Sequence, residues 1–173
     1  RRDRHDAGVV AFEATGTITA LAASPTGLIA VASEPGGIGF VDGGGKASAG
    51  KQSWTCVTAM AFANDSNLLI CVGSTRNAIA EWQRDLLDAG KSGEIWKLDV
   101  TTGAAERIAR DLGYPNGIVV ETDGNIVIRE RSRKHLIRLT PACTRIGQVM
   151  AHLTGYPACP STHLLRPTTP LHQ

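Results

Sequence analysis

The chain has 173 residues, of which 42% are hydrophobic and 20% charged, and its formal net charge is +2. This composition is typical of a folded globular protein and excludes the strongly basic surface that nucleic acids or acidic membranes require, so we expect neither partner. The four cysteines form no CxxC pair and are too sparse for a disulfide framework, and no apolar run reaches the roughly 20 residues of a membrane-spanning helix. The start RRDRHDAG has no methionine and no apolar signal stretch, so we expect a cytoplasmic protein whose N-terminus is incomplete.

Three segments share one pattern, in which a short apolar strand runs into a turn and a second apolar strand follows. They are ITALAASPTGLIAVA from Ile18, VTAMAFANDSNLLICV from Val57 and PNGIVVETDGNIVI from Pro115. Each segment predicts an antiparallel hairpin. In the third, Asp123-Gly124 lies between two apolar runs and predicts a two-residue turn with positive φ.

A third strand of matching character follows each hairpin. These strands are GIGFVD ending at Asp42, GEIWKLD ending at Asp99 and HLIRLT ending at Thr140. Fourth strands are predicted only in the second and third units, at AERIA from Ala105 and GQVMA from Gly147. Four short antiparallel strands in each unit, with the units 39 and then 58 residues apart, are typical of propeller blades.

The longer second spacing is explained by an insertion, STRNAIAEWQRDLLDAGKSG, that predicts one short helix. Ile79, Trp82 and Leu86 share a helical face. Asn77 is a candidate N-cap and Gly90 a candidate C-terminal stop.

The predicted fold class is therefore all-β, a partial ring of about three four-stranded propeller blades with one inserted helix. A sandwich with the same number of strands would not predict a recurring hairpin with a recurring third strand. VVAFEA near residue 10 is interpreted as the outer strand of a preceding blade, and LTGYPA from Leu153 as the approach to a following one. We assign residues 1–158 to the partial propeller and 159–173 to an irregular tail, as truncation or a shifted reading frame would produce.

Thr19, Thr58 and Asn116 are equivalent in the repeat, and each precedes the innermost strand of its blade, where side chains face the central channel. An asparagine carboxamide oxygen suits calcium, which takes about six to eight oxygen ligands. The alternative is that Asn116 only forms a turn with its own backbone. Glu130, after the second strand of the third blade, is either adjacent to the channel or part of a charged edge.

Residues 73–157 resemble the gluconolactonase and senescence-marker-protein (regucalcin) family and its strictosidine-synthase-like relatives. The similar stretches, in order, are EWQRDLLDAGKSGEIWKLDVTTG, LGYPNGIVVETDGNIVIRE, HLIRL and LTGYPA, and they cover about half of the chain. The resemblance implies a six-bladed propeller with one divalent metal, usually calcium, on its axis, and the metal-dependent hydrolysis of lactones or related esters. It implies Asn116 as a metal ligand, with Asn77 or Glu130 near the substrate.

The chain departs from the family pattern in two places. The acidic ligand of the first blade would lie upstream of Arg1, and Ala158 stands where many relatives carry an aspartate, so no general base is assigned. Two alternatives therefore stay open, a non-catalytic propeller that binds a ligand and a metal-independent enzyme similar to strictosidine synthase. The expected partner is a small lactone or ester, and self-association of two partial rings is a hypothesis.

Overall fold

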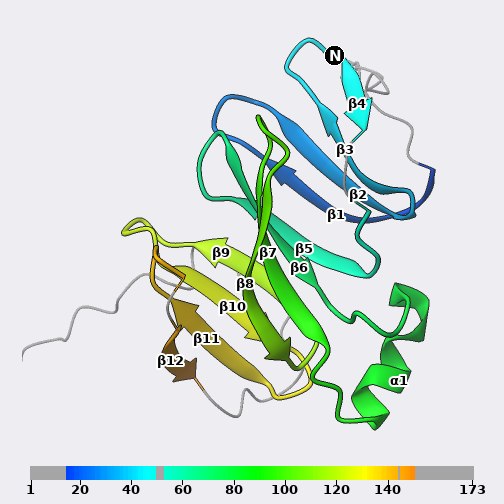
Figure 1. The fold of residues 1–173 in the computed structure, drawn as a ribbon, viewed down its shortest axis with the longest axis vertical. Helices are drawn as coiled ribbons and strands as arrows, with labels where there is room; N and C mark the ends of the chain where they lie inside the picture. The colour runs from blue at the N-terminus through cyan, green and yellow to red at the C-terminus, as the bar shows by residue number, and fades with distance from the viewer. Residues whose placement is uncertain (1–14, 50–52, 144, 151–173) are drawn as a thin grey trace, which may run out of the picture.

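The computed structural model describes residues 15–49, 53–143 and 145–150, and it contains three four-stranded antiparallel sheets (Figure 1). Blade 1 consists of β1 (Gly16–Ala23), β2 (Ile29–Pro35), β3 (Gly37–Val41) and β4 (Ala47–Ala49). Blade 2 consists of β5 (Val57–Phe62), β6 (Asn67–Val72), β7 (Gly93–Asp99) and β8 (Ala105–Leu112). Blade 3 consists of β9 (Pro115–Val120), β10 (Ile126–Glu130), β11 (His135–Leu139) and β12 (Arg145–Met150). A 3-10 helix η1 (Ile79–Glu81) and helix α1 (Trp82–Leu87) connect β6 to β7.

The three sheets are arranged as blades of one ring. In each sheet the strands follow one another in sequence order, so the first and fourth strands lie at opposite edges. The first strands are neighbours across blades, because β1 contacts β5 and β5 contacts β9. The expected radial arrangement, a partial β-propeller with one short helical insertion, is therefore confirmed.

Two apolar cores hold the blades together, and the alternation of side chains along each strand explains both. Leu68 and Ile70 of β6 point toward blade 1, whereas Leu69 and Cys71 point toward blade 3. All four are at most 1% exposed. Burying side chains of this size contributes about 1.5–3 kcal/mol each, so a middle strand buried on both faces stabilises two interfaces at once.

The first core joins blades 1 and 2, and its buried members are Ala30, Ala32, Ile38, Val57, Met60, Leu68, Ile70, Val72 and Leu98. The second core joins blades 2 and 3, and its buried members are Leu69, Cys71, Ile95, Leu112, Ile118, Ile126, Ile128, Ile137 and Leu139.

The hairpin of blade 3 forms as predicted, but its turn is not the predicted two-residue turn. The N–H of Glu121 donates to the carbonyl of Asn125 at 2.8 Å, which leaves three residues in the loop. Only Gly124 in this loop has positive φ, +84°, and Asp123 Oδ1 accepts the N–H of Asn125 across it. A three-residue loop that ends in a left-handed glycine is the common alternative to the primed turn.

Blade 1 has a fourth strand that the sequence pattern did not predict. Ala47–Ala49 pairs antiparallel with β3, in the register Val41↔Ala47. Three small residues after a run of glycines give no apolar alternation, so the sequence predicts no strand there.

The inserted helix is shorter than predicted, and Asn77 does not cap it. The residue at the N-cap position of η1 is Ala78, without a side-chain bond. The N–H of Asn77 donates instead to Ser74 Oγ at 3.1 Å, since the serine hydroxyl already shapes the preceding turn. Ala89 adopts φ +47° and the N–H of Gly90 donates to the carbonyl of Asp85, so the reversal begins one residue before the predicted glycine.

The segments VVAFEA and LTGYPA and the tail from 159 to 173 lie outside the described residues, as does the side chain of Leu86. Within the described part of the chain, no helix is long and apolar enough to cross a membrane.

Candidate functional site

The first strand of every blade begins at the end of the sheet where the second strand stops, because the two run antiparallel. We call this the start end, and the opposite end, which holds the hairpin turns, the turn end. The connections from second to third strands also lie at the start end, including the helical insertion of residues 73–92. The longest loop of the described blades is therefore beside the inner-strand starts, where propeller ligands are expected.

Thr19, Thr58 and Asn116 occupy equivalent positions, as the repeat predicts, but they lie within β1, β5 and β9 and do not precede them. The pairing of each inner strand with its neighbour shifts register at this point, between Ile18 and Ala20 in β1 and between Val57 and Ala59 in β5. The corresponding shift in β9 lies between its pairs with Ile128 and Glu130. A bulge redirects a side chain, which is why such irregularities are frequent beside functional sites.

The three side chains nevertheless have different surroundings. Thr58 Oγ1 donates to the carbonyl of Pro115 and so links blade 2 to blade 3. Thr19 Oγ1 is buried and has no hydrogen-bond partner among the described residues. Asn116 Oδ1 accepts a hydrogen bond from Arg129 Nε at 2.8 Å. Arg129 is only 7% exposed, so blade 3 carries a buried guanidinium at this position.

These residues do not fit the predicted calcium site. The one amide oxygen that was assigned to the metal is bound by a guanidinium, and a cation would be repelled at that distance. The equivalent positions in the other two blades are threonines, and the described residues contain no cluster of three or more His, Cys, Asp or Glu side chains able to hold a metal ion. Asn116 is therefore better described as the partner of Arg129.

Glu130 is also engaged by protein groups. Its carboxylate is completely buried and accepts the N–H of Gly113 at 2.7 Å, and Oε1 lies 3.1 Å from Arg133 Nη1. Oε2 lies 3.9 Å from His135 Nδ1. In this arrangement Glu130 holds the approach to β9 and the loop after β10, and it presents no surface to a ligand. Asn77 is half-buried in the insertion, and its predicted contact with a substrate stays a prediction.

A buried pair that the sequence did not single out precedes two of the inner strands. Cys56 and Tyr114 each stand two residues before the bulge position, and both have positive φ, +53° and +51°. Cys56 Sγ lies 3.8 Å from Tyr114 Oη. Burial is the main reason that the pKa of each group is raised, so both are neutral near pH 7 and neither is an activated nucleophile.

Carboxylates fix the insertion over this end of the blades. Glu34, at the end of β2, accepts the N–H of Cys56 at 3.3 Å and the N–H of Ile79 at 3.2 Å. Asp85 of α1 is 1% exposed and accepts the hydroxyl of Ser92 at 3.1 Å. The guanidinium of Arg131 lies over the Trp82 ring, 3.9 Å from its centroid. Contacts from blades 1 and 3 therefore hold the insertion in one place.

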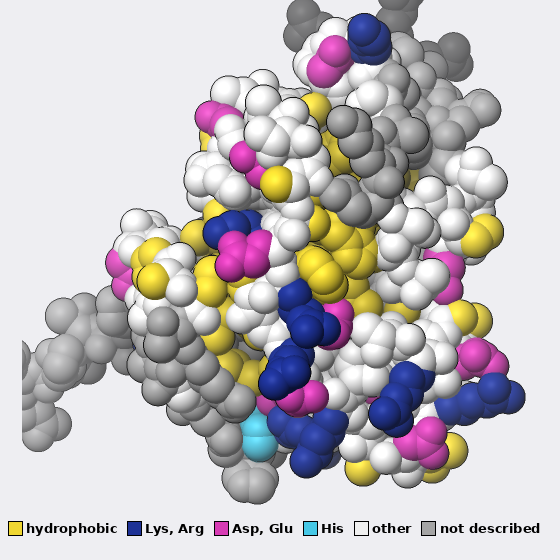
Figure 2. All heavy atoms as spheres, in the orientation of Figure 1, with side chains coloured by type: hydrophobic (Ala, Val, Ile, Leu, Met, Phe, Trp, Pro, Cys, Tyr) yellow, Lys and Arg dark blue, Asp and Glu magenta, His cyan; other side chains and the backbone are white. Residues whose placement is uncertain are grey.

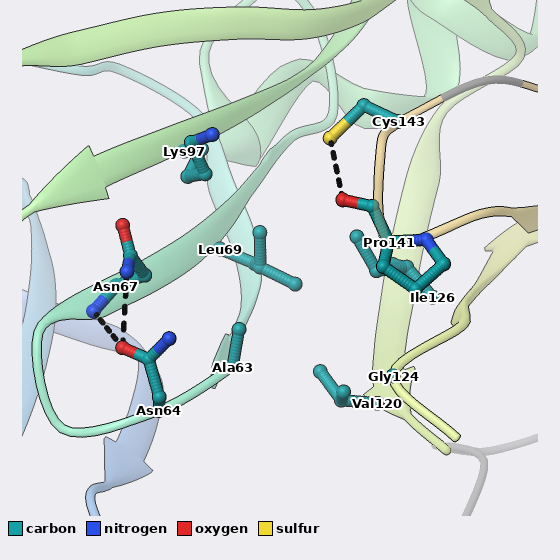
Figure 3. Close-up of a pocket in the computed structure, with 10 residues that line it drawn as sticks. All are labelled: Ala63, Asn64, Asn67, Leu69, Lys97, Val120, Gly124, Ile126, Pro141 and Cys143. Atoms are coloured by element: carbon teal, nitrogen blue, oxygen red, sulfur yellow. Dashed lines mark hydrogen bonds between the residues drawn. The ribbon is translucent and has the colours of Figure 1, made fainter. Parts of the chain in front are cut away.

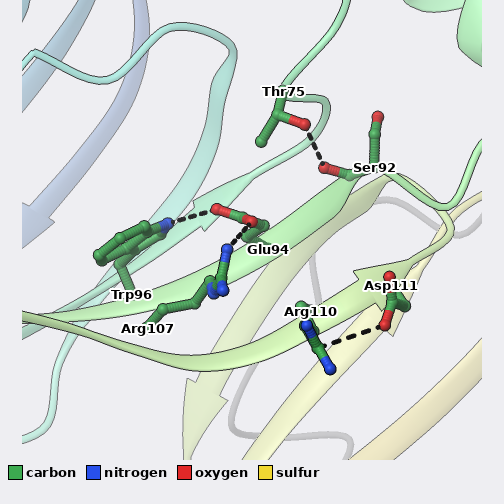
Figure 4. A network of polar contacts seen from close by, with 7 residues as sticks. All are labelled: Thr75, Ser92, Glu94, Trp96, Arg107, Arg110 and Asp111. Carbon is green, nitrogen blue, oxygen red and sulfur yellow. Dashed lines mark hydrogen bonds and ion pairs between the residues drawn. The ribbon is translucent and has the colours of Figure 1, made fainter.

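The outer strand of blade 2 carries a solvated row of ion pairs. Lysine and arginine side chains alternate with acidic ones along the middle of the visible face (Figure 2). Arg107 Nη1 lies 2.7 Å from Glu94 Oε1, and the other oxygen of Glu94 accepts Trp96 Nε1–H at 2.8 Å (Figure 4). These pairs join neighbouring strands of one blade, and an exposed pair such as Lys97–Glu106 contributes about 0–1 kcal/mol.

A cavity of about 280 Å³ lies at the turn end, between the hairpins of blades 2 and 3 (Figure 3). Its polar groups are already used, since Asn64 Oδ1 accepts the N–H of Asn67 and Lys97 Nζ lies 3.1 Å from Glu106. Cys143 also lines the cavity, and burial raises the pKa of its thiol. This cavity offers little chemistry, which leaves the start end as the candidate site.

Comparison with known proteins supports the fold. No family model matches the sequence, and no curated protein matches it. A solved structure of selenomethionine-substituted virginiamycin B lyase from Staphylococcus aureus is similar, with 13% identity and a TM-score of 0.60. A catalytically inactive variant of that lyase with quinupristin has 14% identity and a TM-score of 0.57.

Both alignments cover 82% of this chain and 44% of the neighbour. The chain therefore spans less than half the length of these proteins, and the likeness establishes the propeller fold alone.

Proposed function

We propose that this chain is part of a β-propeller that binds a small molecule with a carbonyl or carboxylate group at the start end of its blades. The observation that carries the proposal is the buried Arg129–Asn116 pair at the bulge of β9. The corresponding positions of the other two blades, Ala32 and Cys71, carry no charge, so the charge is a local feature of one blade.

The chemistry of the pair suits such a ligand. A guanidinium recognises carboxylate and carbonyl oxygens through directed N–H groups, and its charge is strengthened where water is excluded. Asn116 fixes the Nε edge of Arg129 and so orients the planar group. A preoriented donor of this kind is what an oxygen that gains negative charge requires.

Hydrolysis of a lactone or related ester is the reaction that this site would serve in a complete ring. Water would attack the carbonyl carbon, the guanidinium would stabilise the resulting oxyanion, and cleavage of the ester C–O bond would give a hydroxy acid. The resemblance to lactonases supports this assignment.

A non-catalytic binding propeller is the second candidate, and one observation favours it. Glu130 is the nearest carboxylate along β10, but it is completely buried and bound to Gly113 and Arg133. It is not placed to activate a water molecule. Binding without turnover is therefore expected wherever no other carboxylate completes the site.

Titration of the chain with gluconate and with its lactone tests the proposal. We expect Arg129→Met to weaken binding by at least about tenfold, since one charged hydrogen bond contributes about 1.5–3 kcal/mol. Arg129→Lys, which keeps the charge but not the planar group, is expected to bind with intermediate affinity. The matched control is Arg110→Met, because the Arg110 side chain is 71% exposed on the outer strand.

Equal affinities for the wild type and Arg129→Met would contradict the binding site, provided that circular dichroism shows both to be folded. Hydrolysis of the lactone with a rate unchanged by EDTA would identify the enzyme. Binding without hydrolysis would identify the binding module. Activity that EDTA abolishes and calcium restores would contradict the metal-free assignment.

A further inference from the structure

The cavity at the turn end has an apolar wall that the core holds in place. It lies between the hairpins of blades 2 and 3 and has a volume of about 280 Å³ (Figure 3). Leu69 and Ile126 line it and are 1% and 4% exposed, and Val120 lines it beside them. Ligand pockets combine such apolar walls with a few placed polar groups, and their volumes begin at about 300 Å³. The cavity therefore suits a small ligand.

Hydrogen bonds fix the orientation of the Asn64 side chain, which lines one edge of the cavity. Its Oδ1 accepts the backbone N–H of Ser66 at 3.0 Å, the backbone N–H of Asn67 at 2.9 Å and Asn67 Nδ2–H at 3.0 Å. Because the oxygen takes all three bonds, the amide nitrogen is the atom on the cavity side, as Figure 3 shows. Asn64 thus presents hydrogen-bond donors to the cavity.

Lys97 brings a positive charge to the same cavity. Its Nζ lies 3.1 Å from Glu106 Oε2, and an ammonium carries three donor hydrogens, which one bond does not exhaust. The charge acts across the cavity, where Cys143 of blade 3 lies on the far side (Figure 3). Burial is the main reason that the pKa of the Cys143 thiol is raised, and Lys97 opposes this rise whereas Glu106 adds to it.

We propose that this cavity binds a small molecule with an apolar body and one carboxylate. The body would lie against Leu69 and Ile126, and the carboxylate would face the amide of Asn64 and the ammonium of Lys97. Glu106 would compete with the ligand for Lys97, because both offer a carboxylate to the same cation. This site lies at the opposite end of the blades from the site of the proposed function and does not depend on it.

Calorimetric titration with benzoate, an aromatic carboxylate, tests the site. Weak binding is expected for so small a ligand, and benzamide, which has the same shape without the charge, should bind more weakly. Lys97→Met should weaken benzoate binding by about threefold to fivefold, the size expected for a partly exposed charge pair, and should not change benzamide binding. The matched control is Lys91→Met, which removes an exposed lysine at the start end and should have no effect.

Glu106→Gln gives the opposite prediction. Glu106 is 67% exposed, so the variant should fold, and removing its charge should strengthen benzoate binding by up to about fivefold. In a Lys97→Met background the same substitution should change nothing, since the two residues act on the ligand through one charge. Equal effects of Glu106→Gln in both backgrounds would overturn the proposed competition.

A cavity-filling substitution locates the bound ligand. Ala63 is exposed and lines the cavity, so Ala63→Leu should abolish benzoate binding, whereas Ala104→Leu in the next hairpin turn should not. Gluconate, the probe for the start end, should leave benzoate binding unchanged, so this site and the proposed function can fail separately. The proposal would be overturned if gluconate displaced benzoate, if Ala63→Leu bound benzoate like the wild type, or if the wild type bound benzoate no better than benzamide.

Discussion

The two ends of the blades are built in different ways. At the turn end, side chains bond to the backbone only a few residues away. Asp42 Oδ1 accepts the N–H of Gly44, Asn64 Oδ1 that of Ser66, and Asp99 Oδ1 that of Thr101, each two residues along the chain. The exception is the N–H of Thr26, which donates to Asp65 across 39 residues and joins blades 1 and 2.

At the start end several bonds are long-range. Glu34 accepts N–H groups 22 and 45 residues away, and Thr58 donates to a carbonyl 57 residues away. Positive φ occurs at both ends, but non-glycine residues take it more often at the start end. In the turns it falls on Gly27, Gly45, Gly103 and Gly124 and on one non-glycine residue, Cys143. At the start end it falls on Gly16 and Gly37 and on the non-glycine residues Cys56, Asp111, Tyr114 and Lys134. Positive φ strains a non-glycine residue, so it persists only where the surrounding structure holds the residue in that conformation.

The turn end is therefore specified by short sequence motifs and the start end by the assembled blades. A substitution that removes one partner at the start end should therefore cost more than a substitution of a turn residue. Three experiments test this order, beginning with the largest expected effect.

Glu130→Ala should destabilise the fold most. The carboxylate is 0% exposed and holds the N–H of Gly113 and the guanidinium of Arg133. Leaving the buried N–H of Gly113 without an acceptor costs about 1–3 kcal/mol, and the loss of the partner of Arg133, which is 30% exposed, adds to this cost. Urea denaturation measures the free energy of unfolding.

The matched control for this substitution is Glu106→Ala, which removes a 67% exposed carboxylate 3.1 Å from Lys97. We expect it to cost about 0–1 kcal/mol. If the two variants lose equal stability, the start end is no more dependent on buried charge than the surface of blade 2.

Gly124→Ala should have an intermediate effect. Gly124 has φ +84°, and an added Cβ would lie 3.2 Å from Pro141 Cγ. A left-handed conformation costs a residue with a Cβ about 1–2 kcal/mol. Gly43→Ala is the control, because its Cβ would meet nothing within 4 Å and its φ is not positive, so we expect a change within about 0.5 kcal/mol. If the two substitutions change the free energy of unfolding equally, the left-handed conformation of Gly124 does not contribute to the stability of its turn.

The sequence specified most of the architecture because the repeat is local. Alternating apolar residues predicted eleven of the twelve strands, and only Ala47–Ala49 lacked the pattern. The equivalence of Thr19, Thr58 and Asn116 was also predictable, since each lies at the same distance from the turn of its hairpin.

The hydrogen bonds and burial of these side chains could not be predicted from the sequence in the same way. That Asn116 bonds to Arg129 depends on a bulge that turns the two side chains toward each other, and no local motif encodes it. The burial of Glu130 and the contact of Cys56 with Tyr114 likewise arise only when blades 2 and 3 meet. The sequence predicts which residues lie on which strand, but not which side chains contact each other.

The smallest expected effect is the pH dependence that Asp99 contributes at the turn end. The N–H groups of Thr102 and Thr101 lower the pKa of this exposed carboxyl below its ordinary value of 3.8. A lowered pKa in the folded state contributes stability that is complete above the ordinary pKa and is lost as the pH falls through the folded value. Asp99→Asn keeps an acceptor oxygen for the same turn but does not titrate. The difference in unfolding free energy between wild type and Asp99→Asn should therefore be constant from pH 7 to about pH 5 and shrink at lower pH. A difference that stays constant down to pH 2 would mean that the carboxylate charge adds nothing to these bonds, and that the turn is held by geometry alone.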